Sequence, residues 1–302
     1  MHAIDEAEQD GFEVVRLSSP AGVSASYAPG AGMVGCSLTH DGDELLAQRK
    51  GLSAYAESGS TFGIPLLHPW ANRLDTDVDS PLLRRDSNGL AIHGVLPSAL
   101  DWSVAERRAN EHVAYLEAAT SFTRDELLAV FPHPHELTME VWLAHETLTV
   151  QTTIRATHDA PVPVAFGYHP YLRLPGTPRA NWRVELPVRT QLLLDGRMLP
   201  TGAGEPANEP LQRLGERGFD DAYTDLDHPA TFVLEGGGRR SEVTFTGGYE
   251  FAQVYAPPHD ELVCFEPMTA PANALKTQPE GLREVEPGAA FSAAFEIRVW
   301  RL

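Results

Sequence analysis

Short windows in which apolar and polar side chains alternate with a period of two recur along this sequence. Successive side chains of a β-strand point to opposite faces, so this alternation is typical of a strand with one buried face. The clearest window is 147–156, where Leu148, Val150 and Ile154 share one face with Thr152 and Ala156. A similar window at 137–144 precedes it by two residues, which predicts a β-hairpin.

Other windows repeat the pattern, whereas helical periodicity is scarce. Strands are predicted at 13–17, 23–27, 34–38, 102–105, 112–118, 162–166, 242–246, 251–255, 261–265 and 291–299. The 25 glycines and 24 prolines of the 302 residues punctuate these strands. Many short strands separated by turn residues favour an all-β, antiparallel sandwich or barrel.

The spacing of the strands leaves long stretches that are predicted to be irregular, at 59–100, 170–183 and 194–231. Stretches of this length in a compact fold are usually functional. None has the composition of a linker, and no internal repeat has a fixed period. We therefore expect a single domain over residues 1–302.

The net charge of the chain limits the classes of molecule that it is expected to bind. A formal net charge of -19 argues against nucleic acid and anionic membrane surfaces, and it fits a neutral small molecule such as a sugar. The sequence has no apolar run of eighteen residues, and its acidic start lacks the features of a signal peptide. We infer a cytoplasmic protein, in which Cys36 and Cys264 are reduced. The oligomeric state cannot be read from the sequence.

Two segments each place one titratable side chain among apolar and aromatic residues. His169 lies in Phe-Gly-Tyr-His-Pro-Tyr (166–171), and Glu266 lies in Cys-Phe-Glu-Pro-Met-Thr (264–269). Burial and neighbouring groups can tune the pKa values of such side chains toward the working pH. A histidine and a glutamate held in this way indicate an enzyme that moves protons.

Other polar side chains in the irregular stretches suit the recognition of several hydroxyl groups. Arg73 beside Asn72 offers a fork of donors, and His93 precedes Gly94 where the backbone can come close. Further along, Gln253 follows the adjacent aspartates 220 and 221, either of which could accept hydrogen bonds from a polyol. Taken singly, each of these residues is equally consistent with a structural role.

Taken in order, these segments resemble the aldose 1-epimerase (galactose mutarotase) family over about residues 63–273. The resemblance implies a large antiparallel β-sandwich with a shallow sugar cleft and no metal or organic cofactor. By motif match, Glu266 is the general base and His169 the general acid. The same match makes Arg73, His93 and Asp220 substrate-binding residues. Asn72 and Gln253 would also contact the sugar.

The chemistry that this resemblance implies is mutarotation of a hexose such as glucose or galactose. The Glu266 carboxylate would take the proton of the anomeric hydroxyl while His169 protonates the ring oxygen, which opens the hemiacetal. Rotation and reclosure would then yield the other anomer. Glu266 must be ionised for this, and Arg73 could favour that form.

Two alternatives share the expected fold. One is a hexose-6-phosphate epimerase, although such relatives carry an arginine shortly after the His-Gly pair, where this chain has Val95-Leu96-Pro97. Arg84, Arg85 and Arg173 are the cations that keep this alternative open. The other is a sugar-binding protein without catalysis, but such a protein would be expected to lack the histidine or the glutamate.

Two further alternatives concern other chemistry. The segment His133-Pro134-His135-Glu136 has the spacing of a metal site on a strand, although the flanking prolines suit an ordinary entry into the next strand. A glycosidase would need two carboxylates flanking the scissile bond, whereas the partner of Glu266 is a histidine. We therefore expect no metal and no glycosidic hydrolysis.

Overall fold

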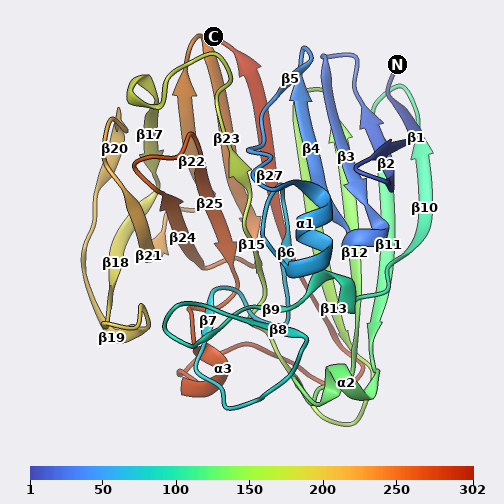
Figure 1. Cartoon of the computed structure of the whole chain (residues 1–302), viewed down its shortest axis with the longest axis vertical. Coiled ribbons are helices and arrows are strands. Elements are labelled where there is room, and N and C mark those ends of the chain that lie inside the picture. Colours follow the sequence, from blue (N-terminus) through green and yellow to red (C-terminus); the bar gives the residue numbers. More distant parts are fainter.

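The computed structural model describes residues 1–302 and consists almost entirely of antiparallel β-sheet (Figure 1). The larger of two main sheets has nine strands in the order β10 (Ser103–Ala109), β11 (Ala114–Phe122), β12 (His135–Ala144), β13 (Thr147–Ala156), β27 (Ala290–Arg301), β23 (Arg239–Gly247), β22 (Ala230–Gly236), β17 (Arg183–Leu186) and β20 (Glu209–Arg213). The second follows the order β19 (Pro200–Pro206), β18 (Val188–Leu194), β21 (Phe219–Leu226), β24 (Phe251–Ala256), β25 (Val263–Met268), β15 (Gly167–Tyr168) and β6 (Leu66–Leu67), with β16 (Tyr171–Leu172) also paired to β25.

Smaller sheets and short helices complete the fold. A five-stranded sheet contains β1 (Ala3–Gln9), β2 (Phe12–Ser18), β3 (Val23–Ala28), β4 (Val34–His40) and β5 (Asp43–Glu44). A three-stranded sheet follows the order β7 (Arg73–Leu74), β9 (Ala91–Val95) and β8 (Leu83–Arg85). A two-stranded sheet pairs β14 (Val162–Pro163) with β26 (Glu284–Val285). The α-helices are α1 (Gly51–Ser58), α2 (Asp125–Leu128) and α3 (Ala274–Thr277), and none is long or apolar enough to cross a membrane.

The two main sheets pack face to face through buried aromatic side chains. Tyr168 of β15 lies with its ring centroid 5.0 Å from that of Phe295 on β27, and its hydroxyl bonds to Thr152 of β13. Phe265 of β25 stacks at 5.3 Å on Phe232 of β22. Such pairs combine apolar burial with a preferred ring geometry. The predicted antiparallel sandwich is confirmed, and the interface lies directly behind the segments that carry His169 and Glu266.

Strands with clear alternation lie where the sequence predicts them. β12 and β13 form the expected hairpin across His145 and Glu146, and the five side chains assigned to one face of β13 are all buried. The prediction for 194–231 is wrong, because this stretch contains β19, β20 and β21. β19 lies at a sheet edge with exposed side chains, so burial imposes no alternation on its sequence.

A buried histidine pair ties the entry of β12 to the loop after β6. His135 Nδ1 donates to the His133 carbonyl at 2.6 Å, which leaves its Nε2 to accept from His68 Nε2 at 2.8 Å. His133 Nδ1 in turn lies 2.9 Å from the Pro161 carbonyl. Both ring nitrogens of His135 are therefore occupied by protein partners, and Glu136 faces solvent on the opposite side of the strand. The 133–136 segment does not form the metal site considered from its spacing.

This histidine pair makes the stability of the protein depend on pH. Burial lowers the pKa of His68 well below 6.5 and that of His135 to about 4. Between about pH 6.5 and 4 the unfolded chain therefore binds more protons than the folded chain, and the free energy of unfolding falls as the pH drops through this range. From His135 alone we expect a loss of about 2 kcal/mol between pH 7 and pH 5.

Urea unfolding at both pH values, in the wild type and in a His135→Gln variant, measures this contribution. The variant keeps an acceptor for His68 but no longer titrates, so its loss between the two pH values should be smaller by that amount. An identical pH dependence in both proteins would contradict the role given to the buried pair.

Candidate active site

The residues singled out in the sequence meet in one cavity of about 210 Å³. It is lined by Arg49, Thr61, Asn72, Arg73, Arg84, Ile92, His93, His169, Tyr171, Asp220, Gln253, Tyr255 and Glu266. This set includes all seven residues assigned to catalysis or substrate binding. They lie at positions 72–73, 93, 169, 220, 253 and 266 of the chain, so the fold itself brings them together.

Three neighbouring strands of the second sheet supply one wall. Gln253 of β24 stands opposite Glu266 of β25 in the strand register, and Asp220 comes from β21 on the other side of β24. Gln253 Nε2 donates to Asp220 Oδ1 at 2.7 Å. Asp221 instead accepts a hydrogen bond from Gln191 and does not line the cavity. Of the two aspartates, Asp220 is therefore the one that a bound molecule can reach.

His169 follows β15 and lies against the carboxyl group of Glu266. Its Nε2 is 3.1 Å from Glu266 Oε1, and both side chains are almost completely buried. The imidazole stacks on the ring of Tyr171 at a centroid distance of 4.3 Å, with the ring of His93 edge-on at 5.5 Å. These contacts fix the imidazole plane, so that a proton can pass directly between His169 and Glu266.

Another wall of the cavity comes from the loops around β7 and β9. Arg73 Nε donates to Asp86 Oδ2 at 2.8 Å and its Nη1 to Asn72 Oδ1 at 3.2 Å, while Nη2 lies 3.9 Å from Asp220 Oδ2. The amide of His93 donates to the Asn72 carbonyl at 2.9 Å. The guanidinium of Arg73 is thus held on two sides, with its remaining donors near Asp220.

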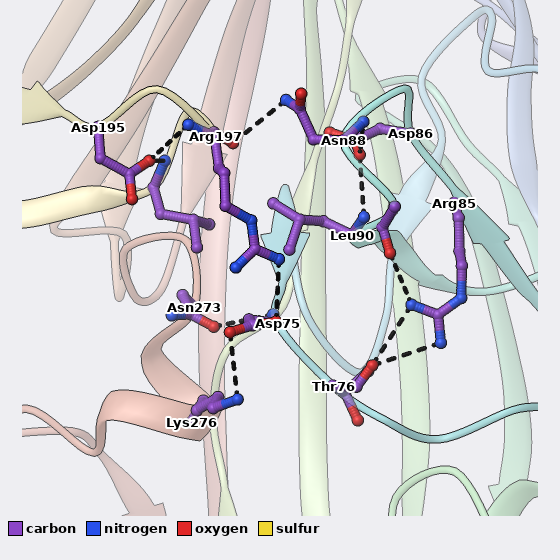
Figure 2. Close-up of polar contacts among 12 residues, drawn as sticks. Asp75, Thr76, Arg85, Asp86, Asn88, Leu90, Asp195, Arg197, Asn273 and Lys276 are labelled. Carbon is purple, nitrogen blue, oxygen red and sulfur yellow. Dashed lines mark hydrogen bonds and ion pairs between the residues drawn. The ribbon is translucent and has the colours of Figure 1, made fainter.

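A polar network at the rim holds the backbone around Arg73 in place. The amide of Asn273 donates to the Arg73 carbonyl, and its side-chain oxygen accepts from the amide of Asp75. Figure 2 shows the Asp75 carboxylate bridging Arg197, in the turn between β18 and β19, and Lys276 of α3. Three segments far apart in the sequence are therefore joined beside the cavity.

Gly94 allows the His93 strand to approach the chain closely. Its φ is +71°, and a Cβ at this position would lie 2.0 Å from the carbonyl oxygen of His68. The amide of Val95 donates to that same carbonyl at 2.9 Å. The His-Gly pair noted in the sequence therefore has a steric reason: a larger residue at position 94 would move His93 out of the cavity wall.

Burial dominates the protonation of the central pair. It raises the pKa of Glu266 well above its usual value, an effect that Asp220 adds to and Arg73 opposes. Burial, together with the charges of Arg49 and Arg84, lowers the pKa of His169 to about 3. Burial therefore favours the neutral form of each side chain, the carboxylic acid of Glu266 and the uncharged imidazole of His169. The expected ion pair, with Glu266 ionised, is one proton transfer away from this arrangement.

Arg49 and Arg84 are the two arginines of the lining that the sequence does not assign to the site. The sequence suggests Arg84 only as a possible phosphate ligand, together with Arg85 and Arg173. Arg85 instead binds backbone carbonyls of its own loop (Figure 2), and neither it nor Arg173 lines the cavity. No sequence pattern links position 49 to this cavity, because its place depends on how the loop after β5 folds over Tyr171.

Comparisons with known proteins agree with this architecture. The family model described as "Aldose 1-epimerase" matches residues 13–298. A galactose mutarotase-like protein from Clostridium acetobutylicum superposes with a TM-score of 0.84 at 18% identity, covering 100% of this chain and 99% of that one. Galactose 1-epimerase from Lactobacillus acidophilus NCFM gives 0.77 at 15% identity, with 100% and 99% covered. No curated protein matches the sequence.

Proposed function

Because this chain belongs to the aldose 1-epimerase family, we propose that it interconverts the α and β anomers of a hexose such as glucose or galactose. The observation that carries the proposal is the contact of 3.1 Å between His169 and Glu266 inside a cavity lined by hydrogen-bonding side chains. A buried acid and base in direct contact suit a reaction that needs two proton transfers at adjacent oxygens. The anomeric hydroxyl and the ring oxygen of a cyclic sugar are such a pair.

The reaction starts from the form in which Glu266 is ionised and His169 is protonated. Glu266 accepts the proton of the anomeric hydroxyl, and the electrons of that O–H bond form the carbonyl of the open chain. The bond from the anomeric carbon to the ring oxygen breaks, and the ring oxygen takes the proton of His169. After rotation about the C1–C2 bond, both transfers run in reverse and close the ring as the other anomer.

The remaining side chains would hold the sugar in place during this rotation. Asp220 and Gln253 offer an acceptor and an amide from rigid strands, and Arg73 offers guanidinium donors beside them. His93 and Asn72 add further polar groups on the loop side. A site built to bond several hydroxyl groups selects a polyol over apolar molecules, because unpaired buried polar groups are costly.

Polarimetry on freshly dissolved α-D-glucose and α-D-galactose tests the proposal. The rate constant for the approach to anomeric equilibrium should rise in proportion to the protein concentration with at least one of the two sugars. A rate equal to that of the buffer for both sugars would count against mutarotation of these hexoses.

The cytoplasmic location inferred from the sequence stays a prediction, as does the single domain.

A further inference from the structure

Two arginines of the cavity form no ion pair within the protein. Arg49 comes from the loop between β5 and α1, and its guanidinium carbon lies 5.2 Å from the ring centroid of Tyr171. Arg84 comes from β8, and its Nη1 donates to the carbonyl of Gly59 at 2.6 Å. Burial lowers the pKa of the Arg84 guanidinium, Tyr171 opposes this, and the charge of Arg49 lowers the pKa further. In a chain with a net charge of -19, these two cations thus line the cavity without forming an ion pair to a carboxylate.

The charged groups divide the cavity into two ends. Beyond the effect of burial, Asp220 raises and Arg73 lowers the pKa of Glu266. Arg73 already forms an ion pair with Asp86. Arg49 lies over the ring of Tyr171, which stacks on His169, and the charges of Arg49 and Arg84 both lower the pKa of His169. Thr61 lies at the same end, where its hydroxyl is 2.6 Å from that of Tyr171. The end of the cavity next to His169 therefore carries a net positive charge. At the end beyond Glu266, the charge of Arg73 is balanced by carboxylates.

The proposed reaction determines which part of a bound sugar would lie at the positive end of the cavity. His169 protonates the ring oxygen, which is bonded to C1 and to C5. The exocyclic C6 group is attached to C5, so it is the substituent next to the ring oxygen on the side away from the anomeric hydroxyl. With C1 at Glu266 and the ring oxygen at His169, C6 extends toward the end that carries Arg49 and Arg84.

We propose that Arg49 and Arg84 form a subsite for a negatively charged group on C6 of the sugar, the carboxylate of a hexuronate or the phosphate of a hexose 6-phosphate. The inference rests on the proposed function, because the reaction fixes the orientation of the ring. Guanidinium groups bind both anions through pairs of parallel hydrogen bonds.

The test compares wild type with Arg49→Gln and Arg84→Gln on D-glucuronate, D-glucose 6-phosphate and D-glucose. In the wild type we expect kcat/KM for at least one anionic sugar to exceed that for glucose by about tenfold or more, since hydrogen bonds to charged groups contribute about that much or more. Each variant should lower this ratio by about tenfold. The ratio is the informative quantity, because any effect through His169 changes all three rates alike.

Arg155→Gln is the matched control, because it removes the same charge from an exposed position on β13 outside the cavity. It should leave the ratio unchanged. Among the anionic sugars, the one with the higher wild-type kcat/KM identifies the carboxylate or the phosphate as the group bound. Equal losses on glucose and on both anionic sugars, or a wild-type preference for glucose, would overturn the subsite while leaving mutarotation intact.

Calorimetric titration of the wild type with D-glucuronate, D-glucose 6-phosphate and D-glucose decides the subsite independently of turnover. Tighter binding of an anionic sugar that is lost in Arg84→Gln supports it even if no sugar is converted, in which case only the proposed function fails. Binding of all three sugars with equal affinity, or of none, refutes it.

Discussion

The Glu266→Gln variant is expected to lose about 10² to 10⁴ of the wild-type acceleration of mutarotation, the range that one general acid or base usually contributes. The amide has the size of the carboxyl group and can still lie against His169 Nε2, but it cannot accept the proton of the anomeric hydroxyl. Glu266 is almost completely buried and is the carboxylate in contact with His169, so its loss leaves no base beside the imidazole. The loss should appear in kcat more than in KM.

His169→Ala should lose activity to a similar extent, since the ring oxygen then has no acid. Both variants are measured by polarimetry, beside thermal unfolding to show that they are folded. Glu261→Gln serves as the control, because it makes the same chemical change at an exposed position two residues before β25. Wild-type rates in either Glu266→Gln or His169→Ala would refute the role assigned to that residue.

The Gly94→Ala variant is expected to lower the free energy of unfolding by about 2 to 5 kcal/mol, the sum of left-handed backbone strain and overpacking. The new Cβ would lie 2.0 Å from the His68 carbonyl oxygen and 2.3 Å from its carbon, both backbone atoms that no rotamer change can move. The strand must therefore shift, and it would carry His93 with it. We expect mutarotation to fall as well.

Gly89→Ala separates the two contributions. Gly89 has a φ of +77° in the same region of the chain, but a Cβ there would have no atom within 4 Å. This variant should therefore lose only the backbone term of about 1 to 2 kcal/mol and keep its activity. Denaturant unfolding measures the loss in the free energy of unfolding for each variant. Equal losses in the two variants would show that the close approach to His68 does not contribute to the effect of Gly94→Ala.

The alternating strands were predictable because one of their faces is buried and the other is not. β13 shows this best, with every second side chain in the core. β19 could not be found in the same way, since its residues are exposed at a sheet edge and its sequence contains two prolines. Likewise, 162–166 was predicted as one strand, but β14 ends at Pro163, because Ala165 pairs with Trp70 and the carbonyl of Phe166 accepts from the amide of Thr269.

The candidate site was predictable where residue type and local context coincide. His169 and Glu266 stand among aromatic and apolar residues, and the structure brings them into contact. The choice between Asp220 and Asp221 depended on which side of β21 faces the cavity, and a short polar run in the sequence does not show this. Arg49 could not be found at all, because its position follows from tertiary packing of a loop.

The three strands that carry Asp220, Gln253 and Glu266 belong to one main sheet, whereas Arg49 lies in a loop and Arg84 on the short strand β8. The strand residues are spaced by the hydrogen-bond ladder of a sheet whose other face is in the core, so their separation cannot change without rebuilding the protein. The two arginines belong to short segments outside this sheet. The proposed C6 subsite could therefore be changed by exchanging these segments while the spacing of Asp220, Gln253 and Glu266 stays the same.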